Sequence, residues 1–541
     1  MMPTQAIEVS QRLLRRADWR FLLDTPQIDV TLCLADGMLR ESVERVSQSM
    51  ADRDSCARED CDLFVATDPT AEMLENGWSR LRSGGSCYTE WTVRGDSTRP
   101  QSLLEAAGFE QVELYRPWPS IDQSHVWFPA AAPTLAEKYF GRQIAASRGL
   151  LRRVIRSARY AAFHLSRHGL VTTRVAAIAR KRPAITTPGA QESLVMDAVA
   201  RTCVTSEPSQ PPLYLRRLMY TGGPRASSKV VVLVYADSEK RPRLVVKGAR
   251  VSGAAAGLVR ERETLDFLHH HGSAVPLDGV PRAFLASRQA GVHVLCESAL
   301  DGVPITPQMA ITRYGEIADA ATDWLIRLAT ITATDDSSHA HWLAMVERLV
   351  RRFRRFYGAV AHPGLLSRIT DMLQRVAPPA CVCEHRDFSP WNLLIDDRGH
   401  LAAADWESSR IRGVAGPDLI YFLTYLAFYR DGLLGARSAR VSTSTFRSAY
   451  RQAWTMKSET GRINNACFAR YSRALALEPA AAPPLRVLTW LIHTGSEYRR
   501  AREDSQGNPN PESLSGGLFL NLLKLECDGS VAGPYSLKSP P

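Results

Sequence analysis

The sequence predicts an α/β amino-terminal part followed by an α+β carboxyl-terminal part, and three observations predict this division. Short apolar runs alternate with helical stretches over residues 1–183, which is typical of a sheet covered by helices. Residues 184–212 are rich in Pro, Ser and Thr and predict a linker. From residue 213 the order becomes strand, glycine turn, strand, strand and helix, followed by a long helical region. We therefore expect a sheet-rich lobe over 213–300 and a helical lobe over 301–529.

Composition and length are those of a globular protein with several folding units. Of the 541 residues, 45% are apolar and 23% are charged, which excludes fibrous and wholly disordered classes. No apolar run approaches the ~20 residues that span a bilayer, and the first residues lack the features of a signal peptide. We expect a cytoplasmic protein whose ten scattered cysteines are reduced. Residues 530–541 are expected to form a disordered tail.

The first part is predicted to alternate strands and helices in a fixed order. The expected elements are a strand at Ile28–Leu34, a strand at Asp62–Thr67, a helix at Glu72–Leu81 that ends at Ser83–Gly85, a strand at Ser86–Trp91, a helical stretch at Leu103–Ala107 and a strand at Gln111–Tyr115. This order favours a truncated, Rossmann-like sheet.

Three runs in this part, Asp62–Ala66, Leu81–Glu90 and Ala107–Phe109, resemble the carboxyl-terminal half of class I S-adenosylmethionine-dependent methyltransferases. Members of that family bind the cofactor at a Gly-rich loop after the first strand. Here the first strand runs into Ala35–Met38, which contains a single glycine, and only about 27 residues separate it from the Asp62 strand. We therefore expect a degenerate, non-catalytic domain without an S-adenosylmethionine site.

The excess positive charge is concentrated in one segment. Eleven of the 67 basic residues lie within 142–182, where there is no Asp or Glu, although the formal net charge of the chain is +11. This concentration argues against a surface built to bind nucleic acid. Within the segment, residues 142–168 show the apolar spacing of a basic amphipathic helix. Two interpretations stay open, a solvated helix lying on its own domain and a helix that contacts an anionic membrane on the cytoplasmic side.

One short motif carries the chemistry. His385-Arg386-Asp387 is followed by Asn392 five residues after the aspartate, and Asp405 comes thirteen residues after Asn392. This spacing is that of the catalytic loop of the kinase fold. Asp387 would orient and deprotonate the attacking hydroxyl, and Asn392 with Asp405 would hold Mg²⁺ on the nucleotide phosphates. A predicted hairpin between residues 393 and 404 would return Asp405 to Asn392.

The motif, with Trp406 after the metal aspartate and Gly416–Leu419 downstream, resembles the aminoglycoside phosphotransferase and choline kinase-like family over residues 213–500. Only twelve residues separate Asp405 from Pro417, so there is no room for the activation segment of a protein kinase. The resemblance implies a bilobal protein-kinase-like fold, ATP as the donor, with GTP as an alternative, and Mg²⁺ as the metal.

The resemblance also implies a nucleotide site in the sheet-rich lobe. A glycine turn between two strands would cover the phosphates, a lysine on the third strand would contact them, a glutamate on the next helix would hold that lysine, and a hinge strand would contact adenine through its backbone. Glu261 is preferred over Glu263 because it shares a helix face with Leu258 and Leu265. The residues assigned to these roles are Gly222, Gly223, Ser227, Lys247, Glu261, Glu297 and Ala299.

We therefore expect an ATP-dependent phosphotransferase that acts on a hydroxyl of a small molecule of the sugar or glycan type. Between Arg430 and Arg500 there are twelve basic and four acidic residues, which favours a neutral or anionic acceptor over a polycation. The alternatives are a kinase for a protein or lipid headgroup, a non-catalytic nucleotide-binding module and a bifunctional methyltransferase-kinase. Retention of Lys247, Asp387, Asn392 and Asp405 disfavours the non-catalytic module.

Overall fold

A computed structural model gives the structure of residues 3–23, 25–52, 59–94, 98–145, 150–182, 215–223, 225, 228–236, 240–271, 277–289, 292–334, 339–434, 441–505, 507–529 and 531. The expected linker 184–212, Ser227 and all but one residue of the expected tail lie outside these ranges. The chain forms two compact units. Unit 1 comprises residues 1–258 and 283–299, and unit 2 comprises residues 259–282 and 300–541.

The elements of unit 1 follow one another as α1 (Pro3–Arg16), η1 (Asp18–Leu22), β1 (Ile28–Cys33), α2 (Gly37–Glu44), β2 (Ser47–Met50), β3 (Cys61–Thr67), α3 (Ala71–Arg80), β4 (Leu81–Val93), α4 (Thr98–Ala106), β5 (Glu110–Trp118), β6 (Val126–Pro129), α5 (Pro133–Ala145), α6 (Leu150–Arg167), β7 (Thr173–Arg180), β8 (Leu215–Thr221), β9 (Lys229–Ala236), β10 (Leu244–Ala249), η2 (Ser252–Ala254), β11 (Ala283–Gln289) and β12 (Val292–Ser298). Helix α8 (Ala255–His271) begins in unit 1 and continues into unit 2.

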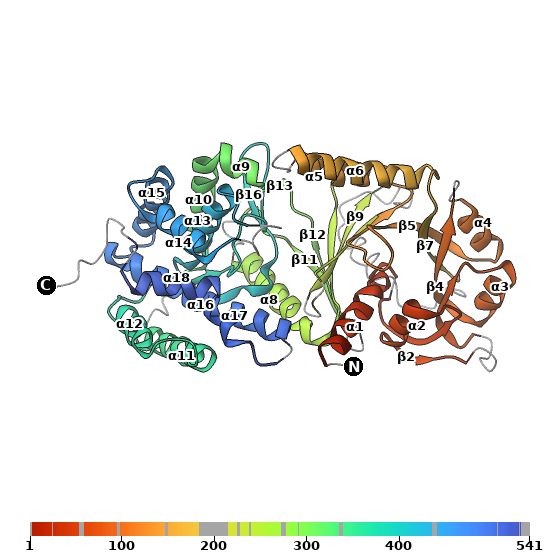
Figure 1. The fold of residues 1–541 in the computed structure, drawn as a ribbon, viewed down its shortest axis with the longest axis horizontal. Helices are drawn as coiled ribbons and strands as arrows, with labels where there is room; N and C mark the ends of the chain where they lie inside the picture. The colour runs from red at the N-terminus through yellow and green to blue at the C-terminus, as the bar shows by residue number, and fades with distance from the viewer. Residues whose placement is uncertain are drawn as a thin grey trace. The chain divides into compact units, whose positions relative to one another are not determined.

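The strands of unit 1 form a single sheet of twelve strands in the order β11-β12-β10-β9-β8-β6-β5-β7-β4-β3-β1-β2 (Figure 1). Strands β2, β1, β3 and β4 are parallel, and β7 is inserted antiparallel between β4 and β5. The sheet is therefore mixed, with a parallel α/β portion at one end and an antiparallel portion at the other.

The two faces of the sheet have separate cores because successive strand residues point to opposite faces. Trp127 packs with Trp19 and Met219 in a core that η1 and α2 cover. Its neighbours Val126 and Phe128 pack on the other face, against α5 and α6. A further core on that second face packs under α3 and α4. The buried side chains of each strand thus account for the positions of the helices.

Pairing between β6 and β8 joins the strands of residues 28–180 to those of residues 215–298. Val126 pairs with Tyr220, and Trp127 pairs with Met219. A buried ion pair adds a second connection, since Arg250 donates to the two carboxylate oxygens of Asp18 over 2.9 and 2.6 Å. Residues 1–182 and the predicted sheet-rich lobe therefore share one sheet and one core.

All four predicted strands of the first part have structural counterparts, with local differences. Helix α3 ends at Arg80 and the chain enters β4 directly, so the glycine pair Gly84–Gly85 lies within a strand rather than after a helix. The predicted helix over 142–168 is divided between the end of α5 and α6. Strands β2, β6 and β7 were not predicted.

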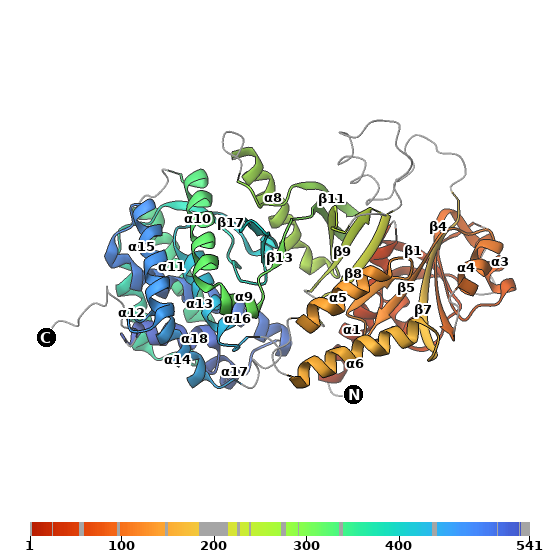
Figure 2. The ribbon, with the colours of Figure 1, turned by 90° about the horizontal axis from the view of Figure 1, so that it is seen from above.

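The elements of unit 2 are η3 (Trp406–Ser408), η5 (Pro479–Ala481), the strands β13 (Val303–Pro304), β14 (Cys381–Glu384), β15 (Leu393–Ile395), β16 (Leu401–Ala403) and β17 (Arg410–Val414), and the helices α9 (Pro307–Thr312), α10 (Tyr314–Thr332), α11 (His339–Tyr357), α12 (Pro363–Gln374), α13 (Pro417–Arg430), α14 (Thr443–Trp454), α15 (Glu459–Ala474), α16 (Ala482–Ser505), α17 (Pro511–Ser515) and α18 (Leu518–Cys527). Figure 2 shows β13 and β17 at the edge of this group of helices. Helix α13 is central, because its first twelve residues are all buried. Within the described ranges, no helix is long and apolar enough to cross a membrane.

Candidate functional site

The predicted catalytic loop connects β14 to a hairpin that returns the chain to the end of the loop. In that hairpin, Leu393 pairs with Ala403. The backbone N–H of Ala404 donates to the carbonyl of Asn392 over 2.8 Å. Asp405, the next residue, is therefore brought beside Asn392, as the thirteen-residue spacing predicts.

Asp387 lies in the loop with its carboxylate oriented by two side chains. The amide of Asn392 donates to Asp387 Oδ2 over 3.0 Å, and the hydroxyl of Tyr421 donates to Oδ1 over 3.4 Å. Burial, and then the negative charge of Asp405, raises the pKa of Asp387 to about 7. Such a carboxylate can accept a proton near neutral pH, which suits a general base.

Asp418 holds the backbone of the loop from the first turn of α13. Its two carboxylate oxygens accept hydrogen bonds from the N–H groups of His385, over 2.6 Å, and Arg386, over 2.8 Å. His385 in turn contacts the carbonyl of Ala404 through Nε2 over 3.0 Å. Burial, and then the charge of Glu384, raises the pKa of Asp418 to about 7. The loop is thus fixed both to α13 and to the hairpin.

The residues predicted to hold Mg²⁺ form a set of oxygen donors. The amide nitrogen of Asn392 is used on Asp387, so its amide oxygen is the group that can face a cation. Asp405 adopts a left-handed backbone with φ of 69°, a conformation that aspartate tolerates better than most residues. The repulsion between Asp387 and Asp405 is a feature that a bound cation would relieve. Carboxylate and amide oxygens are suitable ligands for Mg²⁺.

Lys247 on β10 forms a buried ion pair with Glu297 on β12. The Nζ–Oε1 distance is 2.6 Å, and both side chains are almost fully buried. Glu261 is buried and Glu263 is exposed, so the inward orientation predicted for Glu261 is confirmed. Glu261 Oε1 accepts a hydrogen bond of 2.8 Å from the N–H of Trp406, the residue after Asp405. The role of Glu261 as the partner of Lys247 stays a prediction.

The glycine turn and the hinge strand have their own geometry in unit 1. A side chain at Gly222 would meet the carbonyl oxygen of Lys229 at 2.3 Å, so the close approach of the two strands requires glycine there. Gly223 follows Gly222 in the turn. The N–H of Ala299 donates to the carbonyl of Arg243 over 2.9 Å. A contact between Ala299 and adenine would therefore use its carbonyl group.

A cavity of about 540 Å³ lies between α13, the end of α16, α17 and α18. Its polar lining includes Tyr425, Glu497, Arg500, Asn510 and Ser513. Tyr425 stacks on Tyr421 with ring centroids 4.3 Å apart, and Tyr421 donates to Asp387, so this side of the cavity is close to the predicted catalytic loop. The volume is within the range of small-molecule sites.

Several residues that build the site were not assigned roles from the sequence. Asp418 was visible only as part of the Gly416–Leu419 run, without a function. Tyr421 comes one helical turn later and its ring stacks on that of His493, with centroids 4.1 Å apart. Residues of α13 and α16 meet here through the fold, so their sequence positions carry no local signal.

Comparison with known proteins gives a family match for the part of the chain that contains residues 385–405. Residues 225–454 match the sequence model of the phosphotransferase enzyme family, APH. No curated protein matches the chain. An aminoglycoside-3'-phosphotransferase of type VIII is 22% identical, with 51% of this chain and 98% of that one covered and a TM-score of 0.29.

Two other solved structures are similar to parts of the chain. An aminoglycoside phosphotransferase from Alicyclobacillus acidocaldarius is 13% identical over 60% of this chain and 96% of its own, with a TM-score of 0.34. Phosphoethanolamine N-methyltransferase 2 from Haemonchus contortus is 10% identical over 27% of this chain and 40% of its own, with a TM-score of 0.16. TM-scores this low carry no argument about fold or function. The family model matches residues 225–454, which is less than half of the chain.

Proposed function

We propose that this protein transfers the γ-phosphoryl group of ATP to a hydroxyl of a small molecule. The observation that carries the proposal is the loop in which Asp387 contacts Asn392 while the hairpin returns Asp405 to the same point. Phosphoryl transfer needs a positioned base and a metal site next to each other, and this arrangement supplies the residue types for both.

In the proposed reaction, Asp387 orients the acceptor hydroxyl and takes its proton as the oxygen attacks the γ-phosphorus. The bond between the γ-phosphorus and the β–γ bridging oxygen breaks, and ADP leaves. Tyr421 and Asn392 hold the two carboxylate oxygens of Asp387 in place. Asn392 and Asp405 would hold Mg²⁺, which neutralises charge on the phosphates when it is bound. Lys247 and Glu261, with the turn at Gly222–Gly223, are proposed for the nucleotide.

We propose a neutral or anionic acceptor of the sugar type for the cavity beside Asp387. Tyr425 supplies an aromatic face, and Asn510 and Ser513 supply hydrogen-bonding groups, which suit a molecule with several hydroxyls. Glu497 is already engaged by the N–H groups of Phe519 and Leu520. Of the twelve basic residues between 430 and 500, Arg500 lines this cavity, and the carboxylate of Asp504 lines it as well. The proposal therefore rests on the neutral hydrogen-bonding groups more than on charge.

The test is an assay with γ-labelled ATP, Mg²⁺ and a panel of neutral sugars, acidic sugars, choline-like alcohols and aminoglycosides. The expected result is transfer of label to a neutral or acidic sugar. The same assay with Asp387→Asn gives the matched control. Absence of transfer to every acceptor, together with tight ATP binding, would favour the rival view of a non-catalytic nucleotide-binding module. Transfer to aminoglycosides alone would contradict the proposed acceptor class.

We infer that the first part of unit 1 does not bind S-adenosylmethionine. The support is the turn after β1, where Gly37 is the single glycine, and the short connection from β1 to β3. Calorimetry of the full chain with S-adenosylmethionine tests this. Micromolar binding would instead support a bifunctional methyltransferase-kinase.

We also propose that α6 binds an anionic membrane surface. Phe163 packs into the core of unit 1, whereas the apolar side chains on another face of the helix are exposed. Leu151 is 73% exposed, Val154 56% and Ile155 45%. Exposed Arg153 and Arg159 lie on either side of this stripe. An apolar stripe with flanking arginines is complementary to the headgroups and upper acyl chains of anionic lipids.

Vesicle co-sedimentation tests this surface. Full-length protein is expected to bind phosphatidylglycerol-containing vesicles at low salt and to bind phosphatidylcholine vesicles at least ten times more weakly. Replacing Leu151, Val154 and Ile155 with Gln should remove the binding, while Ile311→Gln, at an exposed apolar position on α9, should not. Equal binding to both vesicle types, or concentration-dependent dimerisation that the triple variant abolishes, would contradict the proposal.

A further inference from the structure

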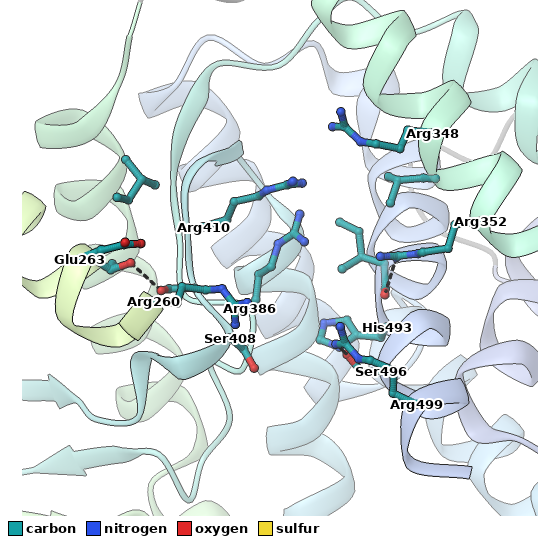
Figure 3. A pocket seen from close by; sticks show the side chains of 15 residues that line it. Arg260, Glu263, Arg348, Arg352, Arg386, Ser408, Arg410, His493, Ser496 and Arg499 are labelled. Atoms are coloured by element: carbon teal, nitrogen blue, oxygen red, sulfur yellow. Dashed lines mark hydrogen bonds between the residues drawn. The ribbon is translucent and has the colours of Figure 1, made fainter. Parts of the chain in front are cut away.

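A second cavity in unit 2, of about 450 Å³, is lined mainly by arginines (Figure 3). They come from α8, α11, the catalytic loop, β17 and α16. We call this space the arginine cavity, and its six arginines are Arg260, Arg348, Arg352, Arg386, Arg410 and Arg499. The arginine cavity shares no lining residue with the proposed acceptor cavity, so the two are separate.

Three of these arginines form the inner part of the cavity. Arg352, Arg386 and Arg410 are partly buried, whereas the other three are exposed. Figure 3 shows Arg410 and Arg352 reaching toward one another from facing elements. Partly buried guanidinium groups gathered in this way need negative charge nearby, because removing them from water is costly.

The described part of the protein supplies little of that negative charge. Arg386 pairs with the buried carboxylate of Glu384 over 2.9 Å, and no other arginine of the cavity forms an ion pair with a described carboxylate. One nitrogen of Arg386, Nη2, is buried without a hydrogen-bond partner among the described residues. Arg352 has only a 3.3 Å contact with the carbonyl of Ile492. Among the described residues, Glu263 lines the cavity, and Glu384 and Asp418 lie next to Arg386, so positive charge exceeds negative charge around the cavity.

The positive charges of these arginines also repel one another. Burial, and then the charges of Arg386, Arg499, Arg410 and Arg348, lowers the pKa of Arg352 to about 10. Burial and neighbouring arginines lower the pKa of Arg410 as well. Both groups stay charged at neutral pH. The repulsion is therefore permanent in the free protein and is relieved by an anion.

We propose that the arginine cavity binds a small soluble anion that carries two phosphate groups. Each phosphate monoester brings a charge of about −1.5 to −2 at neutral pH, so two of them would balance the excess positive charge around the cavity. Guanidinium groups bind phosphate through two parallel hydrogen bonds. The volume is that of a small-molecule site.

This site lies directly behind the catalytic loop. Arg386 immediately precedes Asp387, and His493, which also lines the cavity, stacks on Tyr421. A ligand held by Arg386 would therefore restrain the loop at the residue before Asp387. The proposal goes beyond the phosphotransfer reaction and does not depend on it, because binding can be measured without turnover.

Calorimetric titration of the full chain with pyrophosphate tests the site. The variants below separate this site from the proposed nucleotide site, because no residue assigned to nucleotide binding lines the arginine cavity. Arg352→Gln is expected to weaken pyrophosphate binding by about tenfold or more, since it removes charge-assisted hydrogen bonds. Arg354→Gln is the matched control, because Arg354 is on the same helix, exposed and outside the cavity. The affinity of Arg354→Gln for pyrophosphate should equal that of the unaltered protein.

A thermal measurement gives a second readout with the same variants. Pyrophosphate should raise the Tm of the unaltered protein and of Arg354→Gln, and raise it less for Arg352→Gln. If Arg352→Gln does not fold, Arg410→Gln replaces it. Absence of pyrophosphate binding by the unaltered protein, equal weakening by Arg354→Gln, or tighter binding of citrate than of pyrophosphate would each overturn the proposal.

Discussion

The carboxylate of Asp418 accepts a hydrogen bond of 2.8 Å from the backbone N–H of Arg386, the residue immediately before Asp387. Arg386 has a positive φ of 63°, a conformation that costs free energy for a residue with a side chain. The contact with Asp418 offsets that cost. It acts at the residue immediately before Asp387, and the guanidinium group of that residue lines the arginine cavity. One carboxylate on α13 thus serves both the catalytic loop and the arginine cavity.

Asp387→Asn is expected to reduce phosphoryl transfer by about 10²–10⁴-fold, because an amide cannot take the proton of the acceptor hydroxyl. The size and shape of the side chain are kept, so the Tm should change little. Steady-state kinetics with the acceptor found in the panel assay measures the loss. Asp397→Asn, in the exposed turn of the same hairpin, should keep full activity. Near-normal transfer by Asp387→Asn would show that another group is the base.

Asp418→Asn is expected to lower both stability and activity. An amide offers a single acceptor oxygen, so either the His385 or the Arg386 N–H would face the new NH₂ group. Leaving a buried donor unsatisfied costs about 1–3 kcal/mol. Urea unfolding measures the free-energy loss, and faster amide exchange at Arg386 would locate it. Asp431→Asn, at the other end of α13, should leave both quantities unchanged.

The buried pair of Lys247 and Glu297 gives a prediction for stability. Lys247→Met leaves the Glu297 carboxylate buried without its partner and should cost about 3–5 kcal/mol of unfolding free energy. The double replacement Lys247→Met with Glu297→Gln should cost less than the sum of the two single ones. Denaturant unfolding of the unaltered protein, the two single variants and the double variant gives the double-mutant cycle. Simple additivity would mean that the two side chains do not interact in solution.

His493 predicts how stability depends on pH. Burial, and then the charges of Arg386 and Arg500, lowers the pKa of His493 to about 3, whereas an unfolded histidine titrates near ~6.5. Between these values the unfolded state binds a proton that the folded state does not, so stability falls as the pH is lowered. The expected loss is about 2 kcal/mol between pH 8 and pH 5.

Replacing His493 with Phe, which keeps a flat ring next to Tyr421, should remove this contribution. Urea unfolding at pH 8 and pH 5 tests the prediction, and the difference between the two pH values cancels any change in packing. If the variant shows the same difference as the unaltered protein, the ring of His493 is not held neutral by its surroundings.

The sequence predicts the catalytic loop well because its partners are local. Asp387, Asn392 and Asp405 lie within nineteen consecutive residues, and one hairpin brings them together. The Lys247–Glu297 pair crosses between neighbouring strands far apart in the chain, so residue spacing could not predict it. The arginine cavity could not be predicted from spacing either, because its arginines come from five segments spread between residues 260 and 499. Strand β7 (Thr173–Arg180) lies beyond the predicted helix over 142–168, and no strand was predicted there.

Because β6 pairs with β8, deleting residues 1–182 would expose a strand of the remaining chain. An expression boundary drawn at residue 213 would leave β8 with unpaired backbone groups along the side that β6 now occupies. It would also uncover Met219, which is fully buried against Trp127. Exposed strand edges of this kind promote aggregation. A shortened version designed to carry only the phosphotransferase segment would therefore need a replacement strand at that edge.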